Sequence, residues 1–110
     1  MFELSITSVF TVGGRGTVLA GRLSKCRVQV GDRAVLRTPT REVLCRIDAV
    51  EVARVIRAYA DPADDVGVLC RDIQLEHLAD CTELDGEEQR VTGATLVSAP
   101  RRWWELWRDA

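Results

Sequence analysis

The chain has 110 residues, a formal net charge of −2 and 46% hydrophobic residues, which is the size and composition of one globular domain. Its apolar runs are shorter than the roughly 18 to 20 residues that cross a bilayer. The first residues lack the basic and apolar stretches of a signal peptide, so we expect a cytoplasmic protein without a transmembrane segment. A net negative charge disfavours binding to nucleic acid through phosphate contacts alone.

The first predicted elements are two strands joined by glycines. Phe2, Leu4, Ile6, Phe10 and Val12 alternate with polar residues and are expected on one face of a strand. A second strand is expected at 15–23, and the three glycines between the two strands can supply the positive φ of a tight turn. A phosphate-binding loop is the less favoured interpretation, because strand-like residues follow the glycines where a Walker loop needs a Lys-Ser or Lys-Thr pair and a helix.

Short strands are expected next at 27–30 and 33–38, and a loop that contains Pro39 follows them. Two longer apolar-rich runs cover 43–52 and 53–60, where β-branched residues favour strands over a helix. In the first of these runs, the apolar face is expected to carry Val43, Cys45, Ile47 and Ala49.

The polar stretch 61–65 predicts a turn, and residues 66–70 predict a buried strand. One helical turn is expected at 75–79, and a strand at 82–84 is expected to complete the fold. Residues 85–89 are polar and are interpreted as a linker, and residues 91–99 predict one more strand.

The end of the chain carries all three tryptophans. Residues 101–108 follow Pro100 and predict a short helix with Trp103, Leu106 and Trp107 on one side. Two hypotheses remain open for this segment. Its apolar side packs back on the strands, or Trp103, Trp104 and Trp107 contact a protein partner or a membrane surface.

Cysteines and histidine show no pattern of a metal or catalytic site. Cys26, Cys45, Cys70 and Cys81 form no Cys-x-x-Cys pair and have no histidine at metal-ligand spacing. Cys45 and Cys70 lie in apolar runs, so reduced buried thiols are favoured over a disulfide. The single histidine, His77, is expected in a surface turn without a catalytic partner. We therefore expect no metal, no cofactor and no catalytic residue.

Three blocks of the sequence occur in the order and at the spacing of a known domain. Residues 9–22 contain Val-Phe, Gly-Arg-Gly-Thr-Val and Gly-Arg, residues 30–32 are Val-Gly-Asp, and residues 65–73 are Asp-Val-Gly-Val-Leu-Cys-Arg-Asp-Ile. In these residues the chain resembles the second domain of the translational GTPases, above all elongation factor Tu. The resemblance covers about residues 2–85.

The resemblance implies an all-β fold, a closed antiparallel Greek-key β-barrel over residues 1–85. Residues 86–110 would form an extension with the linker, the further strand and the tryptophan-bearing tail. The sequence has no P-loop, so we expect a stand-alone, non-enzymatic binding module without the GTPase domain of the family. Its expected partners are RNA, either the tRNA acceptor end or the ribosome, or a separately encoded GTPase. The alternative is a protein-interaction adaptor that acts through the tail.

In the family, this barrel helps to hold the aminoacylated 3′ end of tRNA. Carried over position by position, the resemblance assigns the pocket for the terminal adenosine to Gly14, Arg15, Val18, Glu51 and Leu69. It also places Arg54 near the aminoacyl group. Such a pocket is chemically reasonable, because adenine needs an apolar slot and an acceptor for its amino group. The structural alternative places Val18 and Leu69 in the core and pairs Glu51 with Arg54.

Some positions depart from the family pattern. Thr7 and Ser8 replace an acidic pair, and Asp72 replaces a glycine. Asp65 replaces an asparagine, and its carboxylate would repel a nearby phosphate.

Overall fold

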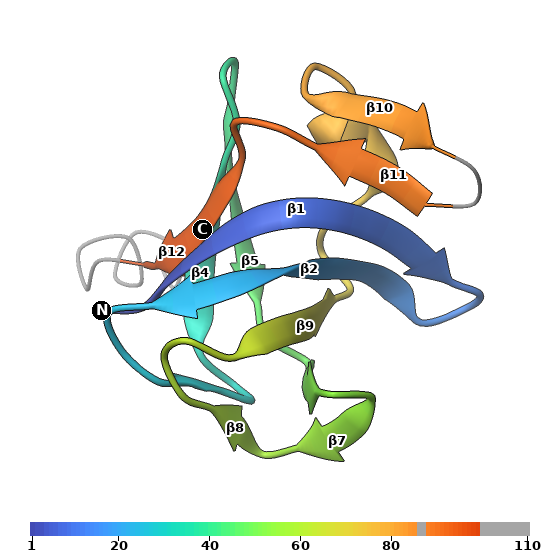
Figure 1. Ribbon diagram of the computed structural model, residues 1–110. Helices are drawn as coiled ribbons and strands as arrows, with labels where there is room; N and C mark the ends of the chain where they lie inside the picture. Colours follow the sequence, from blue (N-terminus) through green and yellow to red (C-terminus); the bar gives the residue numbers. More distant parts are fainter. Residues whose placement is uncertain (86–87, 100–110) are drawn as a thin grey trace.

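The computed structural model describes residues 1–85 and 88–99 (Figure 1). In this part of the chain, twelve strands and one short 3-10 helix follow one another. They are β1 (Glu3–Val12), β2 (Gly16–Ser24), β3 (Val28–Gln29), β4 (Arg33–Arg37), β5 (Glu42–Arg46), β6 (Ala49–Val52), β7 (Val55–Arg57), β8 (Tyr59–Ala60), β9 (Asp65–Cys70), η1 (Leu75–Leu78), β10 (Thr82–Asp85), β11 (Glu88–Val91) and β12 (Thr95–Ser98).

The main sheet is antiparallel throughout and runs in the order β5-β4-β12-β1-β2-β9-β6-β7. Figure 1 shows β1 and β2 as long, strongly bent strands that cross the whole molecule. The predicted all-β antiparallel fold is confirmed. Closure into a barrel is not, because no described ladder joins the two ends of the sheet, β5 and β7. Backbone hydrogen bonds of the loops lie near these ends, from Gly31 N to Ile47 O and from Asp48 N to Leu69 O, each 2.8 Å long.

The core is formed by the inward faces of the strands. β1 contributes Leu4 and Ile6, and then Val9, because its register with β2 shifts between Ile6 and Ser8. This irregularity changes which residues face inward. The expectation that Phe10 shares the face of Ile6 is therefore wrong: Val9 is fully buried, and Phe10 is 38% exposed on the outer side.

The run 43–52 is also divided. Chain direction changes at residues 47–48, between β5 and β6, so the inward side chain of β6 is Val50 and Ala49 lies half-buried on the other face. The expected apolar face thus ends at Ile47. Residues 53–60 form the two short strands β7 and β8 and no helix, as expected from their β-branched residues, but β7 is exposed along its whole length.

Strands beyond residue 85 belong to the same fold. β11 pairs with β10 and with β1, and β12 lies between β1 and β4. The interpretation of residues 85–89 as a linker is therefore wrong for residue 85, which ends β10, and for 88–89, which begin β11, whereas the extra strand expected within 91–99 is present as β12. The expected helix at 101–108 lies outside the described residues. Within the described residues, no helix has the length and apolar character needed to cross a membrane.

All four cysteines are free thiols. Cys45 and Cys70 are fully buried, as expected, whereas Cys26 is exposed and Cys81 is half-buried. A hydrogen bond with Cys45, together with burial, raises the pKa of the Cys70 thiol far above its ordinary value. In the described part of the chain, no three His, Cys, Asp or Glu side chains are placed to hold a metal ion.

Candidate functional site

The outer face of β2, β9 and β6 carries an apolar row. Val18 of β2 lies opposite Leu69 of β9, and Leu69 lies opposite Ala49 of β6. Because side chains alternate along a strand, their neighbours Leu19, Val68 and Val50 point inward and belong to the core. Val18 is nevertheless buried, with 8% of its surface exposed, and Leu69 is half-buried, so the structural alternative that placed them in the core holds for the burial of Val18 although neither residue belongs to the inward core cluster.

A glycine leaves a hollow beside this row. Gly67 lies between Ala20 and Glu51, one row along the strands. A Cβ at Gly67 would lie 3.3 Å from Val18 Cγ1 and 4.0 Å from Glu51 Cβ, which is the space that glycine keeps open. Glycine inside a strand often marks such a close approach.

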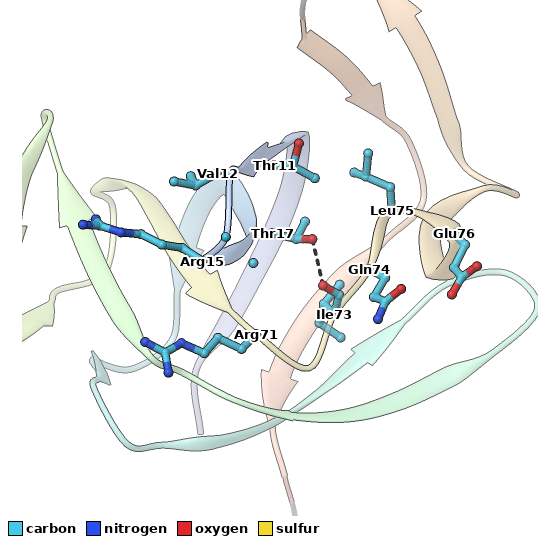
Figure 2. Close-up of a pocket in the computed structure, with 12 residues that line it drawn as sticks. Thr11, Val12, Arg15, Thr17, Arg71, Ile73, Gln74, Leu75 and Glu76 are labelled. Carbon is cyan, nitrogen blue, oxygen red and sulfur yellow. Dashed lines mark hydrogen bonds between the residues drawn. The ribbon is translucent and has the colours of Figure 1, made fainter.

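Three adjoining hollows bring together the six site residues named from the sequence. A hollow of about 90 Å³ is lined by Arg15, Val18, Glu51 and Leu69, together with Gly67. A second one, of about 300 Å³, shares Val18, Glu51 and Gly67 with it and adds Arg54. The third, of about 470 Å³, shares Arg15 and adds Gly14 (Figure 2). All six residues therefore line one continuous stretch of surface.

The third hollow lies between the β1–β2 turn and the segment that follows β9. Thr17 is buried, and its Oγ1 donates a 2.7 Å hydrogen bond to Ile73 O, which ties the two segments together (Figure 2). Gly16 has a φ of +133°, and a Cβ there would lie 3.0 Å from Arg71 Cα. The close approach of these backbones thus requires glycine at position 16. Figure 2 shows Arg15 and Arg71 extending to one side of this hollow, away from Glu76.

Charged side chains at the site are not paired with one another. Among the described residues, the ion pairs are Lys25 with Glu3 and Arg27 with Asp61. Glu51 and Arg54 are not joined, so the alternative that paired them is wrong. Glu51 therefore presents a carboxylate beside the apolar row, with an arginine in the lining on either side of it.

The turn that carries Arg54 is strained. Ala53 has a φ of +51° and Arg54 a φ of +65°, so both central residues of the β6–β7 hairpin are left-handed. This is the backbone of a type I′ turn, in which Asn and Gly are the usual residues. A left-handed residue with a Cβ costs roughly 1 kcal/mol, and such strain occurs most often at functional sites.

Sequence reasoning missed three residues of this surface. Phe10 lies opposite Val18 and lines the second hollow, but the alternating pattern placed it in the core. Ile56 lies opposite Glu51, is 74% exposed and lines the first hollow, although its run predicted an ordinary strand. The sequence shows Gly67 only as a glycine within an apolar run, and this glycine was the one sign of an open space at the site.

Comparison with known proteins supports the fold. No family model matches the chain. The structure is similar to a crystal structure of the bacterial selenocysteine-specific elongation factor EF-Sec, with a TM-score of 0.68 and 20% sequence identity over 88% of this chain. The chain spans only 14% of the length of that protein. The predicted likeness to a β-domain of translation elongation factors is therefore confirmed as a likeness of fold.

Proposed function

We propose that the chain is a non-catalytic, translation-related binding module that takes the unpaired 3′ end of tRNA on the outer face of β2, β9 and β6. The observation that carries the proposal is the meeting of Arg15, Val18, Glu51 and Leu69 around one hollow, from three separate parts of the chain. The likeness of fold to an elongation factor β-domain supports the same conclusion.

The apolar row suits the flat face of a base. Single-stranded RNA is recognised by packing splayed bases on side chains and by hydrogen bonds to their edges. Val18 and Leu69 offer the apolar contact, and the exposed ring of Phe10 lies in the adjoining hollow. Glu51 accepts hydrogen bonds only, so it favours an amino group on the base. Adenine and cytosine carry such a group, whereas uracil does not.

The arginine side chains supply positive charge for the RNA phosphates on one side of the site. Arg15 lines both the first and the third hollow, so a phosphate bound there would lie between them. Asp65 lines the second hollow and repels a phosphate at that end. With a net charge of −2, the chain has little general attraction for RNA, and binding should depend on these few contacts.

Fluorescence anisotropy with a labelled tRNA acceptor-stem hairpin ending in CCA tests the proposal at low salt. Wild-type protein should bind this hairpin and bind the same hairpin without its three unpaired nucleotides at least tenfold more weakly. Arg15→Glu should weaken binding by about tenfold or more, because it removes one phosphate contact and adds a repulsion. Arg41→Glu, the same charge change in the loop after β4, is the matched control and should leave most of the affinity.

Absence of binding at low salt would reject the proposed ligand. So would equal losses in the Arg15 and Arg41 variants, since these would show only general attraction to the phosphates. Purified ribosomes and a purified translation GTPase are the further probes. Binding to either of them without binding to the hairpin would support a role in translation with a partner other than the tRNA acceptor end.

A further inference from the structure

The third hollow, between the β1–β2 turn and the segment after β9, has two chemically different sides. It measures about 470 Å³ and adjoins the first hollow at Arg15. Figure 2 shows the side chains of Arg15 and Arg71 extending to one side of it. Those of Gln74, Leu75 and Glu76 lie on the other side. A nucleotide has the same division, with an anionic phosphate at one end and a base with a polar edge at the other.

The arginine side of the hollow favours an anion. Arg15 and Arg71 are both exposed, and neither belongs to an ion pair within the described residues. The Asp48 carboxylate accepts a 2.8 Å hydrogen bond from the backbone N–H of Arg71. Among the described residues that line the hollow, Glu76 is the one with a carboxylate, and it lies on the opposite side. A phosphate between the two guanidinium groups would reduce their mutual repulsion and accept hydrogen bonds from both.

The opposite side offers an apolar contact and two polar groups for a base. Val12 and Leu75 are half-buried apolar side chains of the lining. Glu76 accepts hydrogen bonds only, whereas the Gln74 amide both donates and accepts them. Such a pair suits a base edge with an amino group beside a ring-nitrogen acceptor, as in cytosine, whose amino group is a known partner of glutamate. Uracil has a carbonyl group in place of the amino group.

Hydrogen bonds hold both walls of this hollow in place. Thr17 Oγ1 donates to Ile73 O over 2.7 Å and links the hairpin to the opposite wall. Gln74 N donates a 3.0 Å hydrogen bond to His77 Nδ1 at the start of η1. Because the backbone of the walls is ordered before a ligand arrives, binding there costs less conformational entropy.

We propose that the third hollow binds the nucleotide before the terminal one, which is a cytidine in a CCA end. The base would lie against Leu75 with its amino group directed to Glu76. The phosphate that links it to the terminal adenosine would lie between Arg71 and Arg15, the residue that the first and third hollows share. This inference rests on the proposed function and adds a second base to it, so that the module reads two successive nucleotides.

Competition between labelled acceptor-stem hairpins that end in CCA, CUA and CCU separates the two hollows. Wild-type protein should prefer CCA over CUA by about fivefold, the effect of one hydrogen bond. Glu76→Leu should abolish this preference and keep that for CCA over CCU, whereas Glu51→Leu should do the reverse. Glu83→Leu, at an exposed position of β10, is the matched control and should keep both preferences. The ratio of affinities is the readout, because each substitution removes one negative charge and raises the general affinity for RNA.

The phosphate contact is tested by charge reversal. Arg71→Glu should weaken binding of the CCA hairpin by about tenfold and lower the slope of log affinity against log salt by about one. Arg41→Glu should leave most of the affinity. Equal losses in these two variants would overturn the assignment of the phosphate to Arg71.

The base preferences decide between this inference and the proposed function. A preference for CCA over CCU without one for CCA over CUA would overturn the inference and leave the proposed function standing. A preference for CCA over CUA that persists in Glu76→Leu would overturn the inference as well. Absence of binding to all three hairpins would reject both.

Discussion

Two outer faces of the same sheet are built alike and differ in how far they open into hollows. Each presents three apolar side chains in register across three antiparallel strands, Val97-Val35-Leu44 on one and Val18-Leu69-Ala49 on the other. Val35, in the middle of the first row, is 0% exposed, whereas Leu69, in the middle of the second, is half-buried, and the second row opens into hollows beside the Glu51 carboxylate and exposed arginines. Of the two rows, the second is therefore the one that adjoins open hollows, which is why the proposed ligand is placed there.

The largest difference between the two faces is expected when a charged side chain is introduced and the loss of stability is measured. Val35→Asp places a carboxylate at a fully buried position, so we expect a loss of about 3 kcal/mol or more in the free energy of unfolding. Ile56→Asp, on the open face, should change that free energy by no more than about 0.5 kcal/mol. Urea denaturation measures both. Equal losses would mean that the two faces are covered to the same extent.

Filling the hollow should affect binding more than stability. Gly67→Ala adds a methyl group 3.3 Å from Val18 Cγ1, in the space assigned to the base. We expect about a tenfold weaker affinity for the acceptor-stem hairpin, or about 1.4 kcal/mol. Stability should change by less than about 1 kcal/mol, because reduced chain entropy in the unfolded state offsets the tight contact. Unchanged RNA affinity would place the ligand elsewhere.

Removing the carboxylate should alter base preference. Glu51→Leu keeps the size of the side chain but loses the acceptor for an amino group, a hydrogen bond worth about 1 kcal/mol. The preference for a terminal adenine over uracil should fall by about fivefold, as measured by competition between two labelled hairpins. A preference that persists in the variant would assign the recognition of the amino group to another residue.

The smallest effects are expected at the strained β6–β7 turn. Ala53→Gly and Arg54→Gly each relieve a positive φ and should raise the free energy of unfolding by about 0.5–1 kcal/mol. Ala53→Gly should leave RNA binding unchanged, whereas Arg54→Gly should weaken it and reduce its salt dependence. Identical RNA binding by the two variants would mean that Arg54 does not contribute to RNA binding.

Local sequence patterns were sufficient for much of the fold. The glycines after β1 predicted a tight hairpin, and the apolar run 66–70 predicted the buried strand β9. The irregularity near Ser8 and the break after Ile47 left no sign in the pattern, although each reverses the faces that follow. β11 was missed because three of its four residues are polar, and its pairing with β1 and β10 comes from tertiary structure.

The candidate site was predictable only in part. Its six residues were named from a resemblance, and the structure places them on one stretch of surface. Phe10 and Ile56 were missed because their exposure depends on the β1 irregularity and on the position of β7 at the end of the sheet that the described strands form. Their role in binding RNA, like that of the other six, stays a prediction.

The most direct test of the account is an NMR titration of the full chain with a short single-stranded RNA ending in CCA. The account predicts shifts in the resonances of Val18, Gly67 and Leu69, and no shift in those of Val35 and Val97. Shifts confined to the Val35 face, or none at all, would contradict the claim that the open face is the one that binds.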